Sequence, residues 1–165
     1  MIFFVYLKNE QSFERMDKLS TKQKIFDACI QSQQETLDAI RQAMEEAQNA
    51  AIEEVNTLDV YESHRTQYLQ KTEMFGRQYA KSLEVMEVLN KVLPLRAFDT
   101  IQFGAAVITD SQHIYISAGI GKVTVEGQEW FAISTQVPIF EAMRNKKAGD
   151  TIIFNNKKIK ILEVL

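Results

Sequence analysis

The sequence contains few of the residues that interrupt a helix or cross-link a fold. Its 165 residues include two prolines, six glycines and one cysteine, and neither proline nor glycine occurs before Gly76. The single cysteine, Cys29, excludes an internal disulfide, so we expect a chain suited to the reducing cytoplasm. Because proline and glycine are absent from it, the first part of the chain is free to form long helices.

The sequence also lacks a strong charge of one sign and a long hydrophobic run. Its net charge of −3 gives no overall attraction to nucleic acid or acidic membranes, although a local basic patch can sit within that balanced total. The apolar run at residues 2–7 is far shorter than the roughly 20 residues of a membrane span. No basic segment precedes this run and no small-residue cleavage site follows it. We therefore expect no membrane partner, and we interpret residues 1–20 as an N-terminal tail or a short strand, with Met1 or Met16 as the start.

Apolar residues at alternating spacings of three and four run through residues 21–93. They are Leu37, Ile40, Met44, Ala47 and Ala51, and then Phe75, Tyr79, Met86, Leu89 and Leu93. Such a stripe lies along one side of a helix and needs a partner helix. Turn-forming residues near 56–62 predict a reversal, hence an antiparallel coiled-coil hairpin that begins at Ser20 or Thr21 in a monomeric protein. The alternative is one continuous helix of about 70 residues that pairs in a parallel dimer.

After Pro94, which cannot continue a helix, the hydrophobic period changes to two. Alternating apolar residues begin at Ile101 and recur in short runs to the end of the sequence, with turn signals at 119–121, 126–128 and 155–156. One short helix fits from Pro138 to about Asn145. Residues 97–165 therefore predict a small antiparallel sheet domain with one short helix, and the whole chain predicts an α+β fold.

The reversal carries two acidic residues, Asp59 and Glu62, three positions apart. On the first turn of a helix this spacing puts both carboxylates on one face. One interpretation is helix capping by Thr57 or Asp59 with an acid three residues on. The other is a pair of exposed carboxylates that lends ligands to a Mg²⁺ ion held by a partner, since Mg²⁺ usually takes one or two carboxylates and fills its other positions with water and phosphate. On either interpretation we expect no tightly bound cofactor.

Three segments of residues 97–165 resemble the C-terminal domain of the bacterial Gre transcript-cleavage factors, GreA and GreB. FGAAV at 103–107 resembles the opening of that family's sheet, and ISTQVPIFEAM at 133–143 resembles its strand and Ser-Pro-led helix. KKAGDTI at 146–152 resembles its Gly-Lys-x-x-Gly-Asp turn. The segments occur in the family's order, and the family has an N-terminal antiparallel coiled coil. The resemblance implies an FKBP-like fold for residues 97–165.

The resemblance also implies a partner and a role. Gre factors insert their coiled coil into the secondary channel of RNA polymerase, where two tip acids help to hold a second Mg²⁺ while the polymerase cleaves a backtracked transcript. Asp59 and Glu62 match these acids, whereas Leu58 and Ser63 replace the family's glycine and asparagine. The chain would then be a cytoplasmic accessory factor rather than an enzyme, with indirect contact to nascent RNA and DNA. The alternatives are a non-cleaving regulator of the same channel, an FKBP-like protein-binding module and a purely structural coiled-coil protein.

The remaining distinctive residues predict no second site. We expect Cys29 to be a small buried residue rather than a reactive thiol. His113 should be exposed near a turn, and Trp130 should belong to the core. His64 and Arg65 follow the tip, where a solvated surface and a contact with polymerase are the two interpretations.

Overall fold

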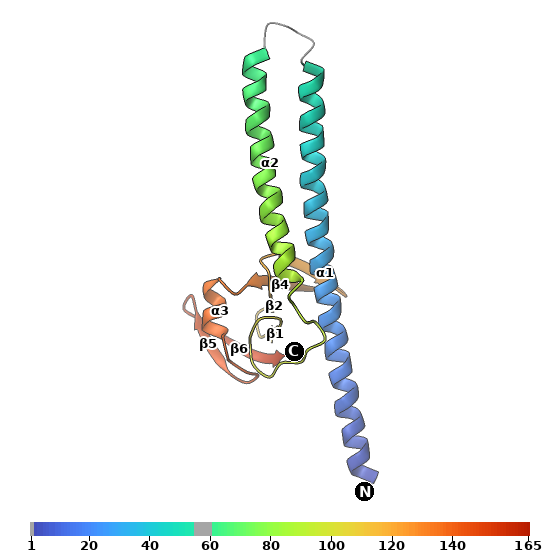
Figure 1. The fold of residues 1–165 in the computed structure, drawn as a ribbon. Coiled ribbons are helices and arrows are strands. Elements are labelled where there is room, and N and C mark those ends of the chain that lie inside the picture. Colours follow the sequence, from blue (N-terminus) through green and yellow to red (C-terminus); the bar gives the residue numbers. More distant parts are fainter. Residues whose placement is uncertain (1, 55–60) are drawn as a thin grey trace.

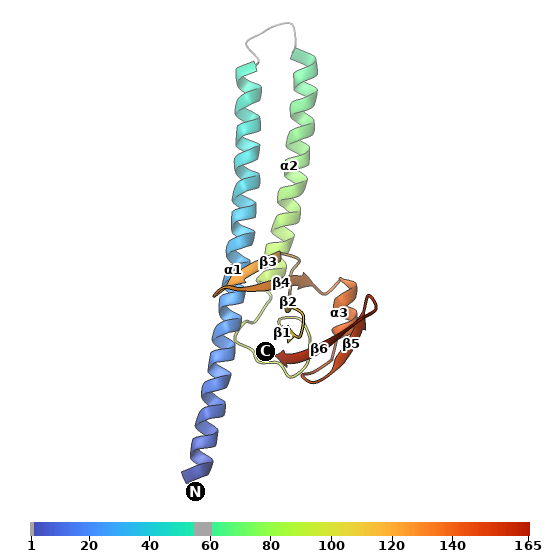
Figure 2. The same ribbon diagram turned by 180° about the vertical axis from the view of Figure 1, so that it is seen from behind.

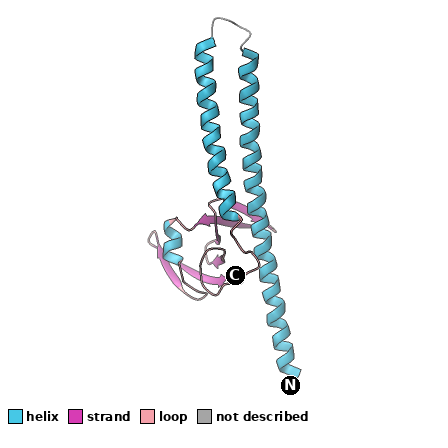
Figure 3. Ribbon diagram, viewed as in Figure 1, coloured by secondary structure: helices cyan, strands magenta, loops and turns pink. Residues whose placement is uncertain are grey.

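The computed structural model describes residues 2–54 and 61–165, and the side chains of residues 16–50 and 66–165. Two long helices, α1 (Ile2–Glu54) and α2 (Tyr61–Leu89), lie side by side and antiparallel, and they project from a small sheet domain (Figures 1 and 3). The elements of that domain are β1 (Ala106–Thr109), β2 (His113–Ser117), β3 (Gly121–Val125), β4 (Gln128–Ser134), α3 (Pro138–Met143), β5 (Thr151–Phe154) and β6 (Lys157–Val164). The predicted α+β class and the intramolecular hairpin are confirmed.

The first helix is longer than the sequence predicted. It begins at Ile2 rather than at Ser20 or Thr21, so residues 2–20 are helical and the expected short strand was wrong. Their assignment as an N-terminal tail stays a prediction. Glutamate, glutamine, lysine and arginine are frequent between residues 8 and 24 and favour helix, and no proline or glycine stops it. This end of α1 extends past the sheet domain, away from the hairpin (Figures 1 and 2). Among the described residues, no helix is both long and apolar enough to cross a membrane. The domain boundaries at 21–93 and 97–165 stay predictions.

The sheet is mixed rather than wholly antiparallel. Its strand order is β3-β4-β2-β1-β6-β5, and β2 pairs with β4 in parallel while the other pairs are antiparallel. β3 lies at the edge of the sheet and pairs only with β4. β4 lies between β3 and β2, antiparallel to β3 and parallel to β2. The expected strand at Ile101 starts later, at Ala106. Two-residue turns with positive φ, at Glu126–Gly127 and Asn155–Asn156, close the β3–β4 and β5–β6 hairpins.

Each face of the sheet carries a buried hydrophobic cluster. On one face, Ile25 and Cys29 of α1 and Leu89 of α2 pack with Tyr115 and Trp130 of the sheet. On the other face, α3 supplies a second cluster. Its buried members are Ile101, Val107, Ile114, Ile116, Phe140, Met143, Ile152, Ile159 and Ile161. The base of the hairpin is therefore part of the hydrophobic core of the sheet domain.

The seam between α1 and α2 is buried at its base and half-buried nearer the tip. Leu37 and Leu89 are buried, as predicted. The predicted seam residues Ile40, Met44, Ala47, Phe75, Tyr79 and Met86 are half-buried. Leu93 is 61% exposed because α2 ends at Leu89, and Val92 takes the buried position instead. Ala51 lies outside the described side chains. The packing therefore holds the arms most firmly where they meet the sheet.

A buried lysine joins α1 to the rest of the protein. The Nζ of Lys22 donates to the carbonyl oxygens of Arg96, in the loop after α2, and of Leu165, at 3.3 Å, directly after β6. It also lies 4.3 Å from the centre of the Phe98 ring. Gly104, at φ +88°, packs against the same ring, and a Cβ added there would lie 3.4 Å from it. One ammonium group thus connects α1, the loop after α2 and the end of the sheet.

The surroundings of Lys22 disfavour the charged form of its amine. Burial and the nearby guanidinium of Arg96 lower the pKa of Lys22 to about 8. The Arg96 guanidinium also lies near the Phe98 ring, at 5.3 Å. Two carbonyl oxygens and one aromatic face therefore compensate the ammonium, while a second cation opposes it.

A second buried polar contact crosses the seam at Gln33, about three helical turns beyond Lys22 along α1. Gln33 Nε2 donates to the Ser82 carbonyl oxygen at 2.8 Å and to the Ser82 hydroxyl oxygen at 2.5 Å. Both residues are buried. A polar pair at a seam position selects one register of the two helices, because any other register buries the amide without a partner. This contact fixes which residues of the two arms lie opposite each other.

Replacing Gln33 by leucine should lower the free energy of unfolding by about 1–3 kcal/mol, because the buried Ser82 hydroxyl then loses its partner. Adding Ser82→Ala should recover most of that loss, since both polar groups are then gone. The double variant should hold the arms in a less uniform register. Urea denaturation measures the first two effects, and distances between spin labels at Gln42 and Lys71 measure the third. A double variant as unstable as Gln33→Leu would contradict this role.

The pH dependence of stability should report Lys22. Its folded pKa of about 8 lies below its ordinary value of 10.5, so between these values the unfolded chain binds more protons. The free energy of unfolding of the wild type, relative to Lys22→Met, should therefore rise from pH 8 to 10.5 and should level off below and above this range, where both states bind the same number of protons. Urea titrations at several pH values measure the difference. Lys24→Met, which removes an exposed lysine two residues away, should parallel the wild type. A Lys22→Met curve that also parallels the wild type would exclude the effect.

Candidate functional site at the hairpin tip

The structure places the ends of both long helices far from the sheet domain. α1 ends at Glu54 and α2 begins at Tyr61, and these ends lie together at the far end of the hairpin (Figures 1 and 2). α2 has 29 residues. At about 1.5 Å of rise per residue, it carries this end about 40 Å from the base. A ligand or partner that bound at this end of the hairpin would therefore lie far from the sheet domain.

The predicted acidic pair belongs to this end of the hairpin. Asp59 lies outside the described residues, between the end of α1 and the start of α2. Glu62 falls in the first turn of α2, and its side chain is outside the described ones. Thr57 and Leu58 also lie outside the described residues. So do the side chains of Ser63, His64 and Arg65. The capping and metal-ligand interpretations of the pair both stay predictions.

The rest of the described chain offers no cluster of metal ligands. Among residues 16–50 and 66–165, no three histidine, cysteine, aspartate or glutamate side chains gather closely enough to hold a metal ion. Two tip carboxylates would fill only part of the octahedral shell of Mg²⁺, so they would hold such an ion weakly alone. On the metal-ligand interpretation, the other ligands of the ion would come from water or from a partner.

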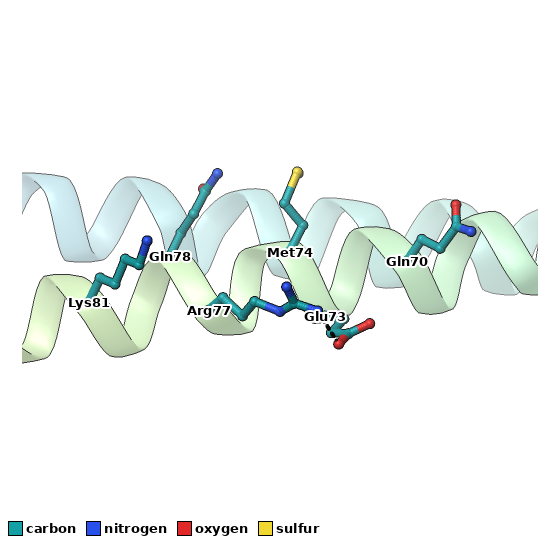
Figure 4. A pocket seen from close by; sticks show the side chains of 6 residues that line it. All are labelled: Gln70, Glu73, Met74, Arg77, Gln78 and Lys81. Atoms are coloured by element: carbon teal, nitrogen blue, oxygen red, sulfur yellow. Dashed lines mark hydrogen bonds and ion pairs between the residues drawn. The ribbon is translucent and has the colours of Figure 1, made fainter.

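A shallow depression follows α2 between the base and the tip. It is lined by Gln70, Glu73, Met74, Arg77, Gln78 and Lys81 (Figure 4). All six residues come from one helix, and Arg77 donates to the Glu73 carboxylate one turn away. Met74 is 47% exposed. A depression formed by one helix does not enclose a small substrate. It gives the arm a flank of mixed charge with some apolar surface.

The other residues singled out in the sequence are structural. Cys29 is buried, and burial raises the pKa of its thiol to about 12, so it is not a reactive thiolate at neutral pH. Trp130 is buried in the core as predicted. His113 was expected to be exposed, but it is half-buried because its ring lies against Trp130, with 4.8 Å between the ring centres.

Sequence reasoning missed three residues that position the tip. Lys22, Gln33 and Ser82 set the attachment and the register of the arms, yet each is polar and was not counted in an apolar stripe. Their spacing was a usable signal. Lys22 and Gln33 fall three and four residues from Ile25 and Cys29, and Ser82 falls between the seam residues Tyr79 and Met86.

Comparisons with known proteins give little beyond this geometry. A scan against protein-family models gives no match, and neither does a search of the curated proteins. A solved structure titled "Structure of the transcription factor Gfh1" is similar over 83% of this chain and 93% of its own, with 14% sequence identity and a TM-score of 0.34. A likeness of this size establishes neither a family nor an activity.

Proposed function

We propose that this chain is an accessory factor of RNA polymerase, which enters the polymerase's secondary channel with its hairpin and promotes cleavage of backtracked transcripts. The observation that carries the proposal is the α1–α2 prong, whose base is buried in the core of a sheet domain. A narrow two-helix prong can reach into a channel while the sheet domain stays outside. The resemblance of 103–107, 133–143 and 146–152 to Gre factors supports the same partner.

In this proposal the chain contributes ligands and position rather than a complete active site. Asp59 and Glu62 would lend carboxylates to a Mg²⁺ ion in the polymerase active centre. The ion would activate a water molecule and stabilise the departing oxygen of the transcript. The hairpin would hold the two acids in place through its base contacts and the Gln33–Ser82 register. Hydrolysis would then be a reaction of the polymerase, and the chain alone would not be an enzyme.

A non-cleaving regulator of the same channel is the second candidate. It is favoured by the two residues that flank the acidic pair, because Leu58 and Ser63 stand where the Gre pattern has glycine and asparagine. A leucine beside the pair lacks the backbone freedom of glycine, which permits conformations closed to other residues. Such a tip could occupy the channel without presenting both carboxylates to the metal.

The double variant Asp59→Ala/Glu62→Ala should lose transcript cleavage while keeping its fold and its binding to polymerase. Its stability should change by no more than about 0.5–2 kcal/mol, the loss expected if one acid caps α2. Cleavage is measured on a stalled, backtracked elongation complex with purified polymerase. The matched control is Glu45→Ala/Glu46→Ala, which removes two exposed acids from α1 and should cleave normally.

Each outcome of this assay separates the two candidates. Equal cleavage by the wild type and the tip variant would exclude the metal role of Asp59 and Glu62. Binding of the wild type to polymerase without cleavage would identify the non-cleaving regulator. No binding of the wild type to polymerase would overturn the proposed function itself.

A further inference from the structure

Basic residues gather in one part of the sheet domain, although the chain as a whole is acidic. Between residues 144 and 160 there are six basic residues and one acidic residue, Asp150, whereas the net charge of the chain is −3. The basic residues are Arg144, Lys146, Lys147, Lys157, Lys158 and Lys160. They follow α3, precede β5 and continue along β6, so they belong to the side of the domain that lies away from α1 (Figures 1 and 2).

The strand register places two of these lysines on an open sheet face. Lys160 lies opposite Thr151, and Lys158 lies opposite Ile153, in the β5–β6 pair. Side chains directly opposite each other share one face of a sheet. The other face of the same strands carries the buried residues Ile152, Ile159 and Ile161, which pack under α3. We call the open side, with Thr151, Ile153, Lys158, Lys160 and Leu162, the outer β5–β6 face.

This outer face combines positive charge with exposed aliphatic surface. Ile153 is 69% exposed and Leu162 is 50% exposed. Neighbouring strands and helices leave these side chains in water, since the hairpin covers the sheet near β3 and α3 covers the opposite face. Scattered apolar residues on a surface are ordinary, but two large ones flanked by lysines form a mixed patch suited to a protein partner.

The nearby acids make their contacts with groups other than the ammonium groups of this face. Asp110 accepts a hydrogen bond from the backbone N–H of Lys160 at 3.1 Å, and Asp150 accepts one from the backbone N–H of Lys147 at 2.9 Å. Glu163 pairs with Lys18 of α1. Within the described side chains, no ion pair involves Lys158 or Lys160. The charge of the outer β5–β6 face therefore remains available to a partner.

We infer that the outer β5–β6 face docks an acidic protein segment of RNA polymerase that also presents aliphatic side chains. This inference rests on the proposed function and adds to it the surface that holds the sheet domain against the polymerase. Lysines steer and orient an acidic partner, while Ile153 and Leu162 lose their contact with water on binding. A nucleic-acid backbone fits less well, because it would leave both aliphatic side chains without a partner and the face has no aromatic side chain for base stacking.

The test is the affinity of the full chain for purified bacterial RNA polymerase. Lys158→Glu should weaken binding about tenfold and reduce its dependence on salt. Ile153→Ser should weaken binding with little change in the salt dependence. The matched control is Lys91→Glu, which reverses another exposed lysine near the base of α2 and should leave the affinity within about twofold. Circular dichroism checks that every variant is folded.

The outcomes distinguish this surface from the proposed function. If the wild type binds polymerase and both face variants bind equally well, the docking face is wrong while the proposed function stands. If the wild type does not bind polymerase, both fail. If Lys158→Glu lowers affinity for a duplex DNA oligonucleotide but not for polymerase, the face is a nucleic-acid contact and the inference is overturned.

Discussion

The structure depends on one buried ammonium group. Lys22 is fully buried, and its acceptors come from the loop after α2 and from the residue that follows β6. An uncompensated buried charge is expensive, so Nζ tolerates little displacement of Arg96 and Leu165. The contact therefore restricts the direction of α1 relative to the sheet. A prong of this length needs such a restriction, because a small rotation at its base becomes a large displacement at its end.

The base of the hairpin and its outer part differ in how firmly they are packed. The apolar contacts that hold the hairpin concentrate at its base, around Ile25, Cys29 and Leu89, where the helices share a core with the sheet. Towards the tip the seam residues are only half-buried, as at Met44 and Tyr79. Fewer buried contacts mean lower local stability, so the outer arms can open without unfolding the base. The geometry thus combines a fixed support with a more adaptable end.

The sequence predicted the parts of the fold that follow from periodicity. The seam, the change of period after Pro94 and the turn at Asn155–Asn156 identified the hairpin and most strands. It did not predict the parallel pairing of β2 with β4, because strand order depends on long-range contacts rather than local pattern. Nor did it predict Lys22, since a lysine at a seam position is normally solvated. For the candidate site, the sequence predicted that the two helices end near residues 56–62, whereas the placement and geometry of Asp59 and Glu62 stay predictions because they depend on parts of the chain outside the described ones.

The strand order also determines when the protein can finish folding. β6 lies between β1 and β5, and Lys22 reaches across 143 residues to Leu165. Contacts over such separations carry a large loop-closure cost and form slowly. The hairpin needs only α1 and α2, so its arms can pair while the strands are still being synthesised. Until β6 and Leu165 have left the ribosome, the nascent chain carries a paired prong whose base lacks the Leu165 carbonyl that accepts from Lys22.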